Sequence, residues 1–219
     1  MRDALIEDGF LPHEFVGSAT IENNTEALAS KITQELKLKI NWNKNNPNTF
    51  NVLREEISNL GILVMQNGVV GNNNHRILNV AEFRAFVLID QYVPLIFLNA
   101  RDSTNAKVFS LCHELVHVWL GVDELYNDNF TSNQIVNNSQ LEKFCNEVAA
   151  EMLLPLSSIQ STLEPQLDIY TNIKHISKVF NVSELVVCIR LKEKKIIDNK
   201  VFNEVYANLL IEMRENLLG

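Results

Sequence analysis

The residues with the clearest chemical potential are two histidines and a glutamate within five positions, His113-Glu114-Leu115-Val116-His117. On a helix, residues four apart lie about 40° apart around the axis, so both imidazoles can reach one tetrahedral metal ion. Glu114 projects beside that face, where its carboxylate can take a proton from a metal-activated water. The pattern therefore predicts a metal-dependent hydrolytic site with His113 and His117 as ligands and Glu114 as general base.

An H-E-x-x-H pattern occurs by chance in roughly one of every hundred sequences of this length. The residues around it therefore have to show whether it is a metal site. The alternative is a polar stripe on a surface helix. The flanking residues argue against it because they leave almost no polar face: Phe109, Leu111, Cys112, Leu115, Val116, Val118, Trp119 and Leu120. A helix that is apolar nearly all round is buried, and buried histidine and glutamate side chains need partners, of which a metal ion is one.

A catalytic metal site needs a third protein ligand. The next predicted helix offers three carboxylates, those of Glu142, Glu147 and Glu151. On a helical wheel Glu142 lies at the edge of the apolar stripe, Glu147 points well away from it, and Glu151 lies off its far edge. This periodicity favours Glu142. An alternative stays open, because Ser139–Glu142 is also a capping box in which Glu142 would bind only the backbone of Ser139.

The elements that must position these residues form an α+β pattern. Apolar spacing predicts helices over 24–38, 49–60, 103–120 and 139–154, followed by three or four shorter helices. Short β-rich runs predict strands of a small, mainly antiparallel sheet at 62–66, 76–80, 83–89 and 93–99. Pro94 indicates that its strand starts there or lies at a sheet edge. Asparagine clusters are predicted to be polar loops between elements, at 41–48, 71–74 and 127–138.

Composition places the chain among globular proteins. Its 219 residues are 46% hydrophobic and 21% charged, which suits one domain, or one domain with a small appendage, and excludes wholesale disorder. A net charge of −8 argues against a general polyanion binder, because such affinity comes mostly from lysine and arginine. Three scattered cysteines, a charged N-terminus and the lack of a long apolar run predict a cytoplasmic protein.

The two site segments together resemble a known family. F-S-L-C-H-E-L-V-H-V-W-L-G, followed about twenty residues later by E-K-F-C-N-E-V-A-A-E-M-L-L-P, is similar to the ImmA/IrrE metallopeptidases. Those enzymes resemble compact gluzincins and act on helix-turn-helix repressors. The resemblance covers roughly residues 15–200. It implies a zincin-like fold, His113, His117 and Glu142 as ligands of Zn²⁺ or Mn²⁺, Glu114 as general base, and a repressor protein as substrate.

The resemblance also implies a domain plan. Residues 1–20 resemble the linker that follows an N-terminal helix-turn-helix domain in many relatives, and no such domain precedes them here. The chain is then either a separately encoded peptidase that meets its repressor in trans, or a fragment without its DNA reader. Residues 21–165 are expected to form the peptidase core and 166–219 a helical C-terminal part.

Several features admit other interpretations. Residues 173–196 are predicted to form a helix, a short turn and a second helix, with several lysines and Arg190. This pattern is typical of a DNA-reading unit, but it also suits two ordinary packed helices, and the acidity of the chain favours packing. A metal sensor without turnover is a third possibility, and DNA binding by this chain alone is not expected.

An exposed strand, 93–99 or 83–89, would suit an extended substrate peptide. His75 and Tyr126 are weak candidates for a second carbonyl-polarising group, and Cys112 and Cys145 are expected to be packing residues.

Overall fold

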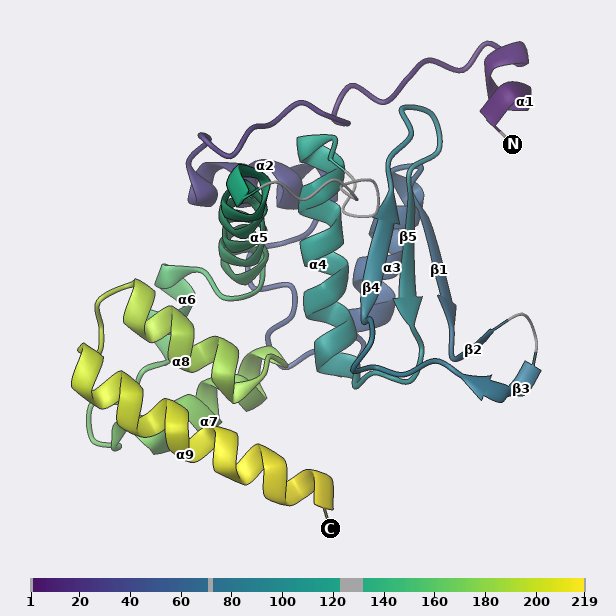
Figure 1. Ribbon diagram of the computed structural model, residues 1–219. Coiled ribbons are helices and arrows are strands. Elements are labelled where there is room, and N and C mark those ends of the chain that lie inside the picture. Colours follow the sequence, from purple (N-terminus) through teal and green to yellow (C-terminus); the bar gives the residue numbers. More distant parts are fainter. Residues whose placement is uncertain (1, 71–72, 123–131, 219) are drawn as a thin grey trace. The chain divides into compact units, whose positions relative to one another are not determined.

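The computed structural model describes residues 2–70, 73–122 and 132–218 (Figure 1). The chain divides into two compact units. The first unit combines residues up to Ile40 with Asn48–Met152, and the second combines Asn41–Pro47 with the chain from Leu153 onward. The first unit holds the strands and the second is helical, which confirms the predicted α+β class.

The main sheet of the first unit has three strands in the order β1 (Leu63–Asn67), β5 (Leu95–Asn99) and β4 (Ala85–Leu88). β4 pairs with β5 antiparallel, whereas β1 pairs with β5 in parallel. A separate antiparallel pair joins β2 (Val69–Val70) and β3 (Asn73–Ile77). Two of these three strand pairs are antiparallel, as expected of a mainly antiparallel sheet, and the parallel pair is possible because the chain between β1 and β5 is long enough to return and run beside β1 in the same direction.

The predicted strand 93–99 is the central strand, so its interpretation as a sheet edge is wrong. Pro94 instead stands immediately before β5, where its missing N–H costs nothing, and its carbonyl accepts a hydrogen bond from Leu63 N at 2.8 Å. The other candidate edge, 83–89, contains β4, which is the last strand on its side of the three-stranded sheet.

Two helices cover one face of this sheet, α3 (Thr49–Asn59) and α4 (Thr104–Leu120). Alternate strand residues such as Val87, Ile96 and Leu98 are buried, which is the pattern of a sheet face packed on a core. α4 begins at an N-cap, where Ser103 Oγ accepts a hydrogen bond from Ala106 N, and ends at Gly121 in the left-handed conformation. Its apolar residues are buried on every side, as the sequence predicts.

The end of α4 is held by an N-terminal segment, residues 13–19. Gly17 N donates to Val118 O at 3.1 Å, and Ala19 N donates to Trp119 O at 2.9 Å. The ring of Phe15 stacks on Trp119 with centroids 4.7 Å apart. This segment adds donors to carbonyls in the last turn of the helix, of which Val118 O also accepts from Gly121 N, and it precedes α2 (Thr25–Glu35). A further short helix, α1 (Arg2–Glu7), lies at the N-terminus.

The second site helix, α5 (Ser132–Leu153), begins earlier than predicted. Residues 132–138 were expected to be an asparagine-rich loop, and the structure places them in α5 instead. Helix propagation adds one hydrogen bond per residue, and no proline or glycine interrupts this segment, so the helix extends despite weak propensity. The rest of that predicted loop, 127–131, and part of the 71–74 loop lie outside the described residues.

The second unit contains α6 (Leu156–Thr162), α7 (Ile169–Phe180), α8 (Glu184–Glu193) and α9 (Asn199–Leu218). Asn43 is buried among them, although its cluster was expected to be a polar loop. Its side-chain amide donates to Leu153 O at 2.9 Å and to Phe180 O at 2.8 Å, so it satisfies carbonyls at the ends of two helices. Within the described residues, no helix is both long and apolar enough to cross a bilayer.

The close approach of Gly121 to Gly17 generates a stability prediction. A Cβ at Gly121 would lie 2.8 Å from Gly17 Cα, and φ is +67° there. Gly121→Ala should therefore lower the free energy of unfolding by about 2 kcal/mol or more, measured by urea titration. Gly9→Ala is the matched control, because Gly9 has φ +78° but no atom within 4 Å of the added methyl. A loss no larger than that of the control would contradict the packing role.

Candidate metal centre

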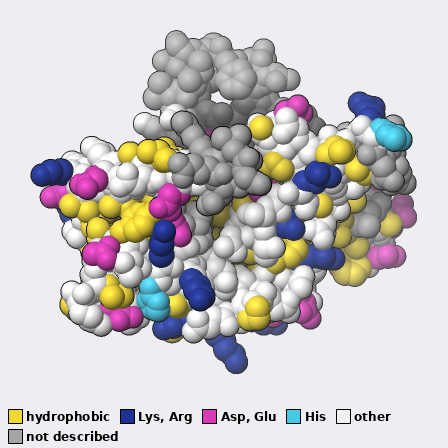
Figure 2. Space-filling model, turned by 90° about the horizontal axis from the view of Figure 1, so that it is seen from below, with side chains coloured by type: hydrophobic (Ala, Val, Ile, Leu, Met, Phe, Trp, Pro, Cys, Tyr) yellow, Lys and Arg dark blue, Asp and Glu magenta, His cyan; other side chains and the backbone are white. Residues whose placement is uncertain are grey.

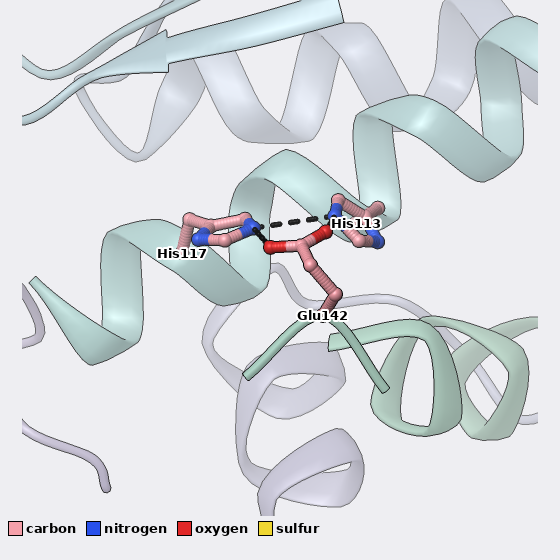
Figure 3. Close-up of side chains that lie close together, drawn as sticks. All are labelled: His113, His117 and Glu142. Carbon is pink, nitrogen blue, oxygen red and sulfur yellow. Dashed lines mark hydrogen bonds and ion pairs between the residues drawn. The ribbon is translucent and has the colours of Figure 1, made fainter. Parts of the chain in front are cut away.

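Two consecutive turns of α4 present His113 and His117 on one face (Figure 3). Their Nε2 atoms lie 3.2 Å apart, and the His117 side chain is completely buried while that of His113 is 13% exposed. Because the helix is apolar all round, water cannot solvate these ring nitrogens freely. The two imidazoles therefore need a shared partner at the point where their Nε2 atoms converge.

Glu142 on α5 reaches the same point. Its Oε2 lies 3.2 Å from His113 Nε2 and its Oε1 lies 3.4 Å from His117 Nε2. One ligand atom from each residue can be chosen so that all three lie within 4.8 Å of one another. A tetrahedral zinc ion with bonds of 2.0–2.1 Å holds its ligand atoms about 3.3 Å apart. The spacing and the donor types therefore fit a divalent metal ion.

The capping-box interpretation of Glu142 is wrong. α5 starts at Ser132, so Ser139 lies inside the helix and its backbone N–H is not at a helix start. The two other carboxylates of this segment do not join the group of ligand atoms: Glu147 pairs with Lys143 at 3.8 Å, and Glu151 is buried elsewhere on α5.

The electrostatics of the site also favour a cation. Burial by itself would lower the pKa of His117, but hydrogen bonding with Cys145 and Glu142 and the charge of Glu114 outweigh it and raise that pKa. Glu114 is 5% exposed, so its charge acts through a poorly screened interior. The raised pKa indicates that these groups favour a positive charge at this point, which is also the condition for holding a metal cation.

Two residues behind the ligands were missed by the sequence interpretation. Asn146 Oδ1 lies 3.0 Å from His113 Nδ1, which is the contact that fixes a metal-binding histidine with Nε2 free to coordinate. Cys145, expected only to pack, also contributes to the raised pKa of His117, so its thiol lies near that imidazole, and burial raises the pKa of the thiol. The available signal for Asn146 is its place four residues after Glu142, one helical turn along the same face.

The remaining candidates lie away from this cluster. Burial raises the pKa of the Cys112 thiol, so it stays protonated and packs. His75 is exposed on β3. His13 stacks on Phe15 at 4.9 Å, and His175 lies 3.6 Å from Glu164. Tyr126 lies outside the described residues.

Comparison with known protein families supports the same assignment. Residues 58–192, well over half of the chain, match the family described as the IrrE N-terminal-like domain (Peptidase_M78), and this range includes both site helices. The chain belongs to the ImmA/IrrE family of metallopeptidases. Its helices and small sheet agree with the α+β, zincin-like fold expected of that family.

The other comparisons add little beyond the ImmA/IrrE assignment. A solved structure described as a Mycobacterium tuberculosis transcriptional regulator is similar over 76% of this chain, with 16% sequence identity and a TM-score of 0.48. The similarity covers 46% of that structure, so this chain spans less than half of its length. No curated protein sequence matches the chain.

The contact between Asn146 and His113 generates an affinity prediction. Asn146→Ala should weaken zinc binding about 10- to 100-fold, because the imidazole loses the acceptor that orients it. A competition titration against a chelating dye measures this affinity. Asn146→Asp keeps a hydrogen-bond acceptor and should retain most of the zinc affinity. Lys143→Ala, on the exposed side of α5, is the control and should bind zinc like the parent. Equal affinity in Asn146→Ala and the parent would contradict the orienting role.

Proposed function

We propose that this ImmA/IrrE chain is a zinc-type endopeptidase that uses His113, His117 and Glu142 as metal ligands. The observation that carries the proposal is the convergence of these three side chains, whose ligand atoms lie within 4.8 Å of one another: Glu142 comes from α5, and the two histidines come from the buried helix α4, which also carries Glu114. A zinc ion held there would polarise the scissile carbonyl and bring the pKa of a bound water to about 7. Manganese is the alternative ion for two histidines and one carboxylate.

Glu114 is the proposed general base. It follows His113 on α4, and its charge raises the pKa of His117, so the carboxylate lies close to the ligand cluster. The carboxylate takes the proton of the attacking water and returns it to the leaving nitrogen, so that one group serves both halves of peptide hydrolysis. Its burial strengthens this role, because bulk water does not compete for the proton.

β4 is the proposed docking strand for the substrate. It packs against α4 and has β5 on one side, which leaves it at the border of the three-stranded sheet. An extended peptide can add to such a border through backbone hydrogen bonds. The family resemblance supports a helix-turn-helix repressor as the substrate and the cytoplasm as the place of reaction.

A DNA-reading role for α7 and α8 has less support. The two helices and their short turn exist as predicted, but three of the cations are engaged within the unit. Arg190 is buried and bound to Glu193 at 2.9 Å, Lys174 pairs with Glu212 at 3.2 Å, and Lys192 lies over the ring of Phe202 at 4.1 Å. Phosphate contacts need exposed cations, so these observations favour the packing interpretation.

Substitutions of Glu114 and Glu142 should affect different steps, the first cleavage and the second metal binding. Glu114→Gln should keep the metal and slow cleavage at least about 100-fold, because only the proton acceptor is lost. Glu142→Ala should weaken metal binding itself. Metal content by mass spectrometry and cleavage of a co-expressed helix-turn-helix repressor measure the two effects. Parent-like cleavage by Glu114→Gln would contradict its role, and parent-like metal content in Glu142→Ala would contradict the third ligand.

A further inference from the structure

The helical second unit carries an open groove that the peptidase site does not use. The start of α7 and the exposed side of α9 line a volume of about 600 Å³. Its apolar residues are Ile169, Val201, Val205 and Ile211. Ile211 is 54% exposed, which is unusual for an isoleucine without a covering element.

The other lining residues of this groove are three acidic residues together with Tyr170 and Asn208. Asp168, Glu204 and Glu212 contribute carboxylates, and no lysine or arginine is among the described lining residues. Hydrogen bonds from Tyr170 and Lys174 lower the pKa of Glu212, so it stays ionised. Figure 2 shows hydrophobic side chains gathered at the left of the view, with both acidic and basic side chains around them. The groove therefore combines an apolar floor with a negative border.

These features select the chemistry of an occupant. Lys174 lies at the edge of the groove and pairs with Glu212 at 3.2 Å, but the three carboxylates outnumber it, so the groove would repel a nucleic acid or an anionic membrane. The lining on α9 runs from Val201 to Glu212, which is about 16 Å along a helix at 1.5 Å per residue. Three turns of a second helix would match that length and would present apolar residues at i, i+3, i+4 and i+7 to the floor.

We propose that this groove docks a cationic amphipathic helix of a partner protein. Leucine-type side chains of the partner would cover Ile211 and the apolar floor, and its lysines or arginines would face Asp168, Glu204 and Glu212. Complementary charges steer such an encounter and fix its register, and the apolar contact supplies affinity. The inference goes beyond the peptidase proposal and does not depend on the metal site.

The test uses a fluorescein-labelled amphipathic peptide of about 16 residues, with leucines at i, i+3, i+4 and i+7 and lysines on both flanks. Fluorescence anisotropy at about 0.15 M salt measures its affinity for the full chain. Glu204→Lys should weaken binding about tenfold, and Ile211→Ser about fivefold. Glu55→Lys, an exposed position on α3 in the first unit, changes the net charge equally and should leave the affinity within about twofold of the parent.

The result that overturns the proposal is an equal loss in Glu55→Lys and Glu204→Lys, because binding would then follow net charge rather than this groove. Failure of the parent to bind the peptide, or equal binding of a peptide with glutamates in place of lysines, would overturn it too. Thermal unfolding verifies that each variant is folded, and Glu204→Gln replaces Glu204→Lys if the reversal destabilises α9. Metal content is unaffected in every arm, so failure here is distinguishable from failure of the peptidase proposal.

Discussion

The structure depends on the convergence of two buried imidazoles with one carboxylate. His113 and His117 place their Nε2 atoms 3.2 Å apart on a helix whose surroundings are apolar. Ring nitrogens in that position are costly unless a cation or a proton lies between them. The carboxylates of Glu142 and Glu114 make a positive charge favourable there, as the raised pKa of His117 indicates. Metal binding would resolve the constraint and would also create the proposed reactive site.

Positioning these groups to within tenths of an ångström requires support from both site helices. α4 is held at its end by the hydrogen bonds from residues 13–19 and by the approach of Gly17 to Gly121. α5 contributes both Glu142, the proposed third ligand, and, one turn later, Asn146, whose Oδ1 lies 3.0 Å from His113 Nδ1. One helix thus sets a ligand and the orientation of another ligand, so a small shift of α5 would disturb two contacts together.

The sequence predicts those parts of the account that depend on local pattern. The spacing of His113 and His117 and the apolar residues around them predict the buried site helix, and the stripe on 139–154 favours Glu142. The contact of Asn146 with His113 could not be predicted by periodicity, because it joins residues 33 positions apart on two helices. The parallel pairing of β1 with β5 and the burial of Asn43 depend on long-range packing in the same way. The catalytic roles proposed here rest on the H-E-x-x-H pattern together with the family resemblance.

The most direct test of the central claim is the metal content of the purified chain beside that of His117→Ala, measured by mass spectrometry after incubation with zinc. His117 is fully buried and contributes one of the converging nitrogen atoms. The account predicts about one zinc or manganese ion per parent chain, in line with a single three-residue site. It predicts that His117→Ala loses this ion while its circular dichroism shows that the helices are retained. No metal in the parent, or equal metal in the variant, would contradict the account.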